Sequence, residues 1–141
     1  MRVMVMVKAT EDSEAGVMPT RELVDAMMAY NAELVKAGIM LGGDGLKPSR
    51  EGKRIAFDGP SRRVIDGPFA ETRELVAGYW VWEVRDMDEA VAWAKRCPNP
   101  MPGPSELEIR PFVTMEDFGD AVSPETAALE KALRAQGADG V

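Results

Sequence analysis

Apolar and polar positions follow one another in short runs that predict alternating strands and helices. Residues 3–7 alternate Val with Met between charged residues, which is typical of a strand with both faces largely covered. Residues 75–84 are rich in valine and aromatic side chains and predict a strand near the centre of a sheet. Residues 106–112 alternate apolar and charged positions, which indicates an edge or late strand.

Two further segments have the spacing of amphipathic helices. After Pro19, apolar side chains recur at helical spacing until Gly38, where the first helix is expected to end. Asp86, followed three residues later by Glu89, resembles a capping box and predicts the start of a second helix. The prolines from Pro98 onward end that helix, because proline cannot continue the backbone hydrogen bonding.

A β-hairpin is predicted between the first helix and the central strand. Residues 53–57 and 62–66 are β-like runs, and the turn Asp58-Gly59-Pro60-Ser61 separates them. A short apolar run at residues 39–41 precedes this hairpin. The resulting order of strand, helix, strand, hairpin, strand, helix, strand favours a ferredoxin-like α+β sheet, a split βαβ arrangement with both helices on one face.

The second face of such a sheet also needs a cover. Residues 3–7 and 75–84 place apolar side chains on both faces, and a second copy of the chain is the simplest cover, so we expect a homodimer. The end of the chain is acidic, and Ser123-Pro124-Glu125 predicts the start of a peripheral helix. We therefore divide the chain into a ferredoxin-like domain at residues 1–113 and an acidic helical C-terminal extension at residues 114–141.

Composition narrows the chemistry. The 141 residues include 17 Lys or Arg and 24 Asp or Glu, and the net charge of −7 argues against direct binding of nucleic acid. The chain has no His and one Cys, which excludes a His-based triad, a His-ligated zinc site and an internal disulfide. No apolar run approaches the ~20 residues of a membrane span. We expect a cytoplasmic protein that uses no membrane, metal or cofactor.

The densest group of special residues is Asp66-Gly67-Pro68-Phe69-Ala70-Glu71-Thr72. Gly67 and Pro68 impose a tight turn, which fixes Asp66 relative to Glu71 and directs Phe69 toward the core. Two carboxylates held in this way can act as an acid and a base when burial separates their proton affinities. The same residues also fit a structural turn in which Asp66 accepts backbone hydrogen bonds and Glu71 faces water.

Other candidate residues are spread along the chain. No helix follows the glycines at residues 42–45, so this segment fits a bend or bulge rather than a phosphate loop, with Asp44 as a candidate pocket acid. Arg63 on the hairpin could bind an anion, although paired cations on a strand also fit a solvated face. Tyr79, Trp80 and Trp82 could line a cleft or fill the core, and Trp80 and Trp82 are expected to share a face of the strand. Cys97 precedes Pro98 at a helix C-terminus, where thiolate is disfavoured, so we expect it to be inert.

The motif at residues 66–72 resembles the signature for which the DGPF branch of the YCII-related proteins is named. The resemblance covers about residues 1–113, and its ordered series of matches is more specific than any one of them. Four further segments carry it: Gly43-Asp44-Gly45-Leu46-Lys47-Pro48, Gly78-Tyr79-Trp80, Asp88-Glu89-Ala90 and Glu108-Ile109-Arg110-Pro111.

The resemblance implies a dimeric α/β barrel of ferredoxin-like subunits and no established reaction. A His–Asp dyad suggested for the wider group cannot operate here, because the chain has no His; only its acid could persist, as Asp44 or Asp66. Similarity of some relatives to a chlorinated-aromatic dehydrochlorinase implies lyase-like or hydrolase-like chemistry on a small molecule, anionic or aromatic. Association of DGPF members with extracytoplasmic-function sigma factors implies the alternative, a ligand-sensing or regulatory protein without turnover. The candidate residues are Asp66, Asp44 and Glu71 for catalysis, and Arg63, Phe69, Tyr79, Trp80 and Trp82 for substrate binding.

Overall fold

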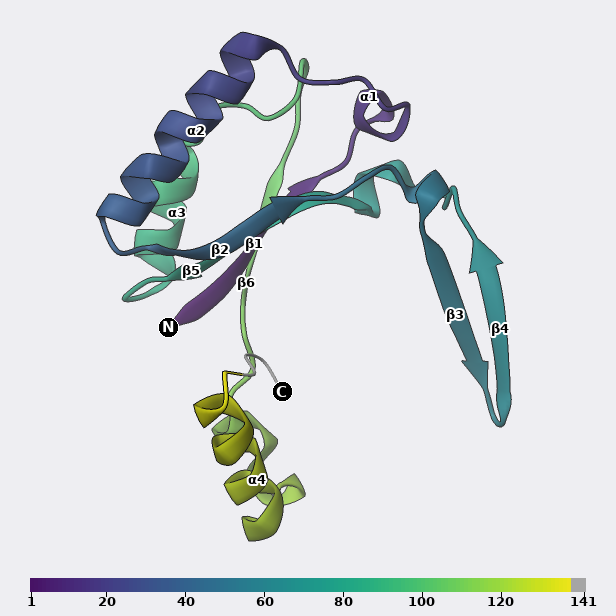
Figure 1. The fold of residues 1–141 in the computed structure, drawn as a ribbon, viewed down its shortest axis with the longest axis vertical. Helices are drawn as coiled ribbons and strands as arrows, with labels where there is room; N and C mark the ends of the chain where they lie inside the picture. Colours follow the sequence, from purple (N-terminus) through teal and green to yellow (C-terminus); the bar gives the residue numbers. More distant parts are fainter. Residues whose placement is uncertain (138–141) are drawn as a thin grey trace. The chain divides into compact units, whose positions relative to one another are not determined.

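The computed structural model describes residues 1–137 and has a mixed α+β fold with antiparallel sheets. The chain forms two compact units that divide between Pro111 and Phe112. The first unit contains a four-stranded sheet and a two-stranded hairpin together with α1, α2 and α3 (Figure 1). The second contains a 3-10 segment and the helix α4.

The four-stranded sheet has the spatial order β2-β5-β1-β6, and all neighbouring strands are antiparallel. The segment predicted as the central strand, β5, has a neighbour on each side, and the predicted edge or late strand, β6, lies at one edge. Both predictions are confirmed. The strands are β1 (Arg2–Lys8), β2 (Met40–Gly45), β5 (Val76–Glu83) and β6 (Leu107–Pro111).

The glycine-rich end of β2 remains part of the sheet. Its register with β5 shifts between Met40 and Gly42, so the predicted bulge is present. Beyond the shift, however, Gly43 pairs with Trp80 and Gly45 with Gly78, which makes this segment a strand rather than a bend. Pairing with β5 offsets the low strand propensity of glycine here.

Helices α2 (Arg21–Lys36) and α3 (Met87–Lys95) lie on the same face of the sheet (Figure 1). Helix α2 begins after Thr20, whose hydroxyl accepts a hydrogen bond from the Leu23 amide at 3.2 Å. It ends before Gly38, whose φ of +74° is a left-handed conformation that favours glycine. The predicted positions of both helices are confirmed.

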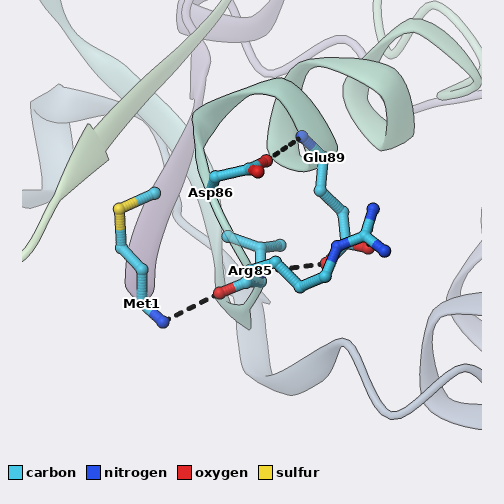
Figure 2. A network of polar contacts seen from close by, with 5 residues as sticks. Met1, Arg85, Asp86 and Glu89 are labelled. Carbon is cyan, nitrogen blue, oxygen red and sulfur yellow. Dashed lines mark hydrogen bonds and ion pairs between the residues drawn. The ribbon is translucent and has the colours of Figure 1, made fainter.

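The cap of α3 differs from the predicted capping box by one residue (Figure 2). The Asp86 carboxylate accepts from the Glu89 amide at 2.9 Å, as predicted. The Glu89 carboxylate accepts a hydrogen bond from the Arg85 amide at 2.9 Å, where a capping box would use the Asp86 amide, and it lies 3.2 Å from the Arg85 guanidinium. The Met1 ammonium donates to the Val84 carbonyl at 2.8 Å, so β1 is tied to the segment that enters this helix.

The core lies between the sheet and the two helices. Tyr30 and Trp80 meet edge to face with ring centroids 6.0 Å apart, and the Trp80 indole donates to the Asn31 side chain at 2.9 Å. The Tyr30 hydroxyl donates to the Trp93 carbonyl at 2.7 Å, which links α2 to α3. The buried cluster consists of Val3, Val5, Val7, Tyr30, Leu34, Ile39, Trp80, Trp82, Val84 and Ala90.

The predicted hairpin is confirmed as β3 (Lys53–Asp58) and β4 (Ser61–Asp66). Within residues 1–137 these strands pair only with each other, in a two-stranded sheet that extends away from the four-stranded one (Figure 1). Gly59, with φ +55°, forms the turn between Asp58 and Ser61, which face each other.

Several short elements connect these parts. In the second unit, α4 (Pro124–Ala135) follows Ser123, whose hydroxyl accepts from the Thr126 amide at 3.1 Å, so the predicted helix start is confirmed. Among residues 1–137, no helix combines the length and apolar character needed to cross a membrane. The sequence pattern did not predict the short elements α1 (Glu11–Glu14), η1 (Ser49–Glu51), η2 (Thr72–Glu74) and η3 (Met115–Ala121).

Candidate functional site

The structure distributes the sequence-predicted site residues over four places. Phe69 and Glu71 belong to the loop after β4. Asp66 is the last residue of β4, and Arg63 lies within that strand and faces Ala56 of β3. Asp44 and Tyr79 are paired across β2 and β5. The last two, Trp80 and Trp82, lie in the core.

Trp80 and Trp82 point toward the helices. Trp82 is fully buried and Trp80 is nearly so, and they pair with Val3 and Val5 of β1, which are buried on the same face. Tyr79 comes directly before Trp80 in β5, so its side chain points to the opposite, open face of the sheet. The structure therefore separates the phenol from the two indoles.

The open face carries a row of four side chains, one from each strand. Asp44 pairs with Tyr79, Tyr79 with Met6, and Met6 with Glu108. Strands in a sheet are about 4.8 Å apart, so the two carboxylates of this row are separated by about 14 Å of sheet. The next row includes Val81 and Met4, and it extends the apolar centre. We call this surface the open face.

The carboxylates at the two ends of the row differ, because within residues 1–137 Glu108 is ion-paired and Asp44 is not. The Lys8 ammonium donates to the Glu74 carbonyl at 3.1 Å and lies 3.5 Å from the Glu108 carboxylate, with only 14% of the Lys8 side chain exposed. Within residues 1–137, Asp44 makes no hydrogen bond or ion pair through its side chain, so it is the open-face carboxylate free to accept from a ligand. A depression beside Lys8 is lined by Lys8, Arg73, Glu74, Glu106, Leu107 and Glu108.

The loop at residues 66–72 is fastened to α1 and η1 by Ser49. The Ser49 amide donates to the Glu14 carboxylate at 2.9 Å, and the Ser49 hydroxyl donates to the other oxygen of that carboxylate. The same hydroxyl accepts from the Phe69 amide at 3.0 Å. The Gly67 amide donates to the Gly52 carbonyl at 3.0 Å. We call this set of contacts the clamp.

Gly67 has no room for a side chain. A Cβ at this position would lie 1.7 Å from the Ser49 carbonyl oxygen, far inside van der Waals contact. The following peptide bond, to Pro68, is cis. The glycine of the motif thus permits the close approach of two backbones on which the clamp depends.

The two carboxylates of the motif are not joined. Asp66 pairs with the Lys53 ammonium at 2.5 Å across the foot of the hairpin, and 72% of the Asp66 side chain is exposed. Glu71 is also exposed and adopts a left-handed conformation, with its carbonyl accepting from the Glu74 amide at 2.8 Å. No hydrogen bond links Asp66 to Glu71 in the described chain. Phe69 is half-buried, and the Arg54 guanidinium lies 3.9 Å from its ring centroid.

Comparison with known proteins identifies the domain. Residues 1–113 match the YCII-related domain. This chain belongs to the YCII-related family. A protein of Rhizobium meliloti (strain 1021) described as uncharacterized is 29% identical over 86 residues, which is 61% of this chain and 69% of that protein. The family inferred from the motifs is confirmed, whereas the assignment to the DGPF branch stays a prediction.

Sequence reasoning missed several residues of this YCII-related domain. Glu14 and Ser49, which hold the clamp, were not singled out from the sequence. Glu14 and Ser49 are 35 positions apart, and neither belongs to a recognisable spacing. Lys8 was missed because the alternation of Val and Met predicts a strand but does not single out the charged residue at its end. Among residues 1–137, no group of three or more Asp, Glu or Cys side chains could hold a metal ion.

Cys97 is a protonated thiol rather than a nucleophile. Burial raises its pKa to about 11, and the thiol donates to the Pro98 carbonyl at 3.2 Å. Burial, together with the neighbouring Cys97, also raises the pKa of Tyr30. Both groups lie under the helices, away from the open face.

Gly67→Ala is expected to break the clamp. The added methyl group must displace the Ser49 carbonyl, so we expect the free energy of unfolding to fall by about 2 kcal/mol or more. Urea denaturation measures the change. Gly45→Ala is the matched control, because a Cβ at Gly45 meets nothing within 4 Å. Equal stability of the two variants would contradict the clamp.

The protonated state of Cys97 makes a pH-dependent contribution to stability. The folded pKa of about 11 exceeds the ordinary 9.0, so the contribution is complete below pH 9.0 and is lost as the pH rises toward 11. The difference in unfolding free energy between wild type and Cys97→Ala should therefore shrink above pH 9.0. Urea denaturation from neutral to alkaline pH tests this, and a difference that stays constant would show that the thiol proton does not contribute.

Proposed function

We propose that this YCII-related protein is a homodimer in which two open faces enclose a cleft for a small molecule. The row Asp44, Tyr79, Met6 and Glu108 is the observation that carries the proposal, because it sets polar groups at both ends of an apolar strip. Ligand sites combine mostly apolar walls with a few placed polar groups. A sheet face with this composition is unusual on the outside of a monomer.

The arrangement of the sheet supports a specific architecture for this dimer. The order β2-β5-β1-β6, with α2 after β1 and α3 after β5, supports a ferredoxin-like subunit of split βαβ type with the hairpin inserted between β2 and β5. Both helices cover one face, and the open face is left for a partner. We accordingly propose that two subunits form a dimeric α/β barrel with the cleft inside.

The open face favours a small aromatic acid as the ligand. Met6 and Tyr79 offer an apolar and aromatic surface for a ring. Lys8 lies two residues beyond Met6 on the same strand and lines the depression together with Arg73. A ligand carboxylate would bind these cations by replacing Glu108, which lies 3.5 Å from the Lys8 ammonium. Asp44, at the other end of the row, can accept a hydrogen bond from a donor on the ligand.

Two roles are compatible with this cleft. Asp44 is the sequence-predicted carboxylate that lies on the open face, so in a lyase-like or hydrolase-like reaction it is a better acid–base candidate than Asp66, which lies at the foot of the hairpin. A ligand-sensing protein associated with extracytoplasmic-function sigma factors would use the same cleft without turnover. Chloride release from a bound chlorinated aromatic acid would establish turnover, and saturable binding without release would favour sensing.

The ligand class can be tested with 4-chlorobenzoate as the probe. NMR of the methionine methyl groups should show saturable shifts at Met4 and Met6, while Met18 and Met28, which are exposed elsewhere, stay unshifted. Lys8→Gln should raise the dissociation constant about tenfold, because the ammonium contact with the carboxylate is lost.

Lys36→Gln is the matched control, since Lys36 lies at the end of α2 and makes no open-face contact. It should leave the dissociation constant unchanged. Shifts confined to Met18 and Met28, or no shift up to the solubility limit of the probe, would contradict an aromatic-acid cleft on the open face.

A further inference from the structure

The hairpin stands apart from the rest of its unit. Its two strands, residues 53–66, pair only with each other, so each has an unpaired outer edge. An isolated two-stranded hairpin is marginally stable in water unless another surface covers it. We call residues 53–66 the arm.

One face of the arm is an exposed apolar strip. Ile55 faces Val64, and Phe57 faces Arg62, so these side chains succeed one another along the same face. Ile55, Val64 and Phe57 are 49%, 57% and 71% exposed. The Arg62 guanidinium lies 4.7 Å from the Phe57 ring centroid, at the tip of the strip. Apolar strips of this kind, edged by charge, are typical of interaction surfaces.

The foot of the arm is held firmly. Lys53 and Asp66 are paired across its base, Arg54 covers Phe69, and the Gly67 amide donates to Gly52. The clamp then joins this foot to η1 and α1 through Ser49. The apolar strip is therefore presented in a fixed direction, which lowers the entropy cost of docking on a partner.

The distribution of charge along the chain indicates which molecule the arm binds. The arm carries four Lys or Arg and two Asp or Glu, a net charge of +2, whereas the rest of the chain carries 13 against 22 and a net charge of −9. A basic, apolar arm is thus complementary to the acidic remainder of a second copy. The edge strand β2 offers the matching surface, because the exposed Leu41 and Leu46 flank Asp44, which has no ion pair within residues 1–137.

We infer that the arm docks on the β2 edge of a second copy, with its apolar strip against Leu41 and Leu46 and Arg62 toward Asp44. This inference rests on the homodimer of the proposed function. In a twofold dimer each copy gives and receives one arm, so two equivalent contacts form. The arm then covers the Asp44 end of the open-face row, and the cleft is complete only when the partner's arm is in place.

Phe57→Asp tests the arm. It places a charge in the docked strip at a position exposed within one chain, so the fold should persist while the dimer dissociation constant rises about tenfold or more. Sedimentation equilibrium measures the constant, and circular dichroism checks the fold. Val35→Asp is the matched control, because Val35 is 62% exposed on α2, and it should leave the constant unchanged.

A charge exchange tests the receiving surface. Arg62→Glu should weaken the dimer, and Arg62→Glu combined with Asp44→Lys should restore much of the lost affinity, because the attraction is rebuilt with opposite signs. Absence of restoration would overturn the assignment of β2.

The outcomes for the arm and for the dimer are distinguishable. A wild-type dimer whose dissociation constant is unchanged by Phe57→Asp would overturn the arm and leave the dimer standing. A monomeric wild type at all concentrations would overturn the dimer itself, and with it the proposed cleft.

Discussion

Strict side-chain alternation in β1 and β5 is the constraint on which the rest of this domain depends. Successive side chains of a strand point to opposite faces, so burying Val5 and Trp80 under the helices obliges Met6 and Tyr79 to face the other way. A slip of one residue would exchange the two sets and place charge in the core. The register that builds the core therefore also assembles the open face, where β2 adds Asp44.

The motif at residues 66–72 serves the arm and the sheet at once. Gly67 allows the loop to approach η1, and the Phe69 amide completes the clamp through Ser49. Asp66 closes the foot of the arm with Lys53. Through these contacts the motif sets the direction in which the arm extends from the sheet. In the proposed dimer its residues would act on the cleft by positioning the arm, while the side chains that contact a ligand would come from the sheet.

Much of the fold was predictable because periodicity and end signals act locally. Thr20, Gly38 and Ser123 lie at the helix ends that the sequence pattern indicates, and Trp80 and Trp82 were expected to share a face. Which face the helices cover depends on packing between distant segments, so only the structure shows that the two indoles lie under the helices and that Tyr79 lies on the open face. The clamp could not be predicted either, since its residues are far apart in sequence and join through backbone approach rather than through any spacing.

Isotope-filtered NMR on a mixture of labelled and unlabelled chains tests most directly whether a second copy covers the open face. We predict intermolecular nuclear Overhauser effects at the Met4 and Met6 methyl groups, whose side chains form the apolar centre of that face. Intermolecular effects that are confined to Met18 and Met28, or that are missing in a sample shown to be dimeric, would contradict it.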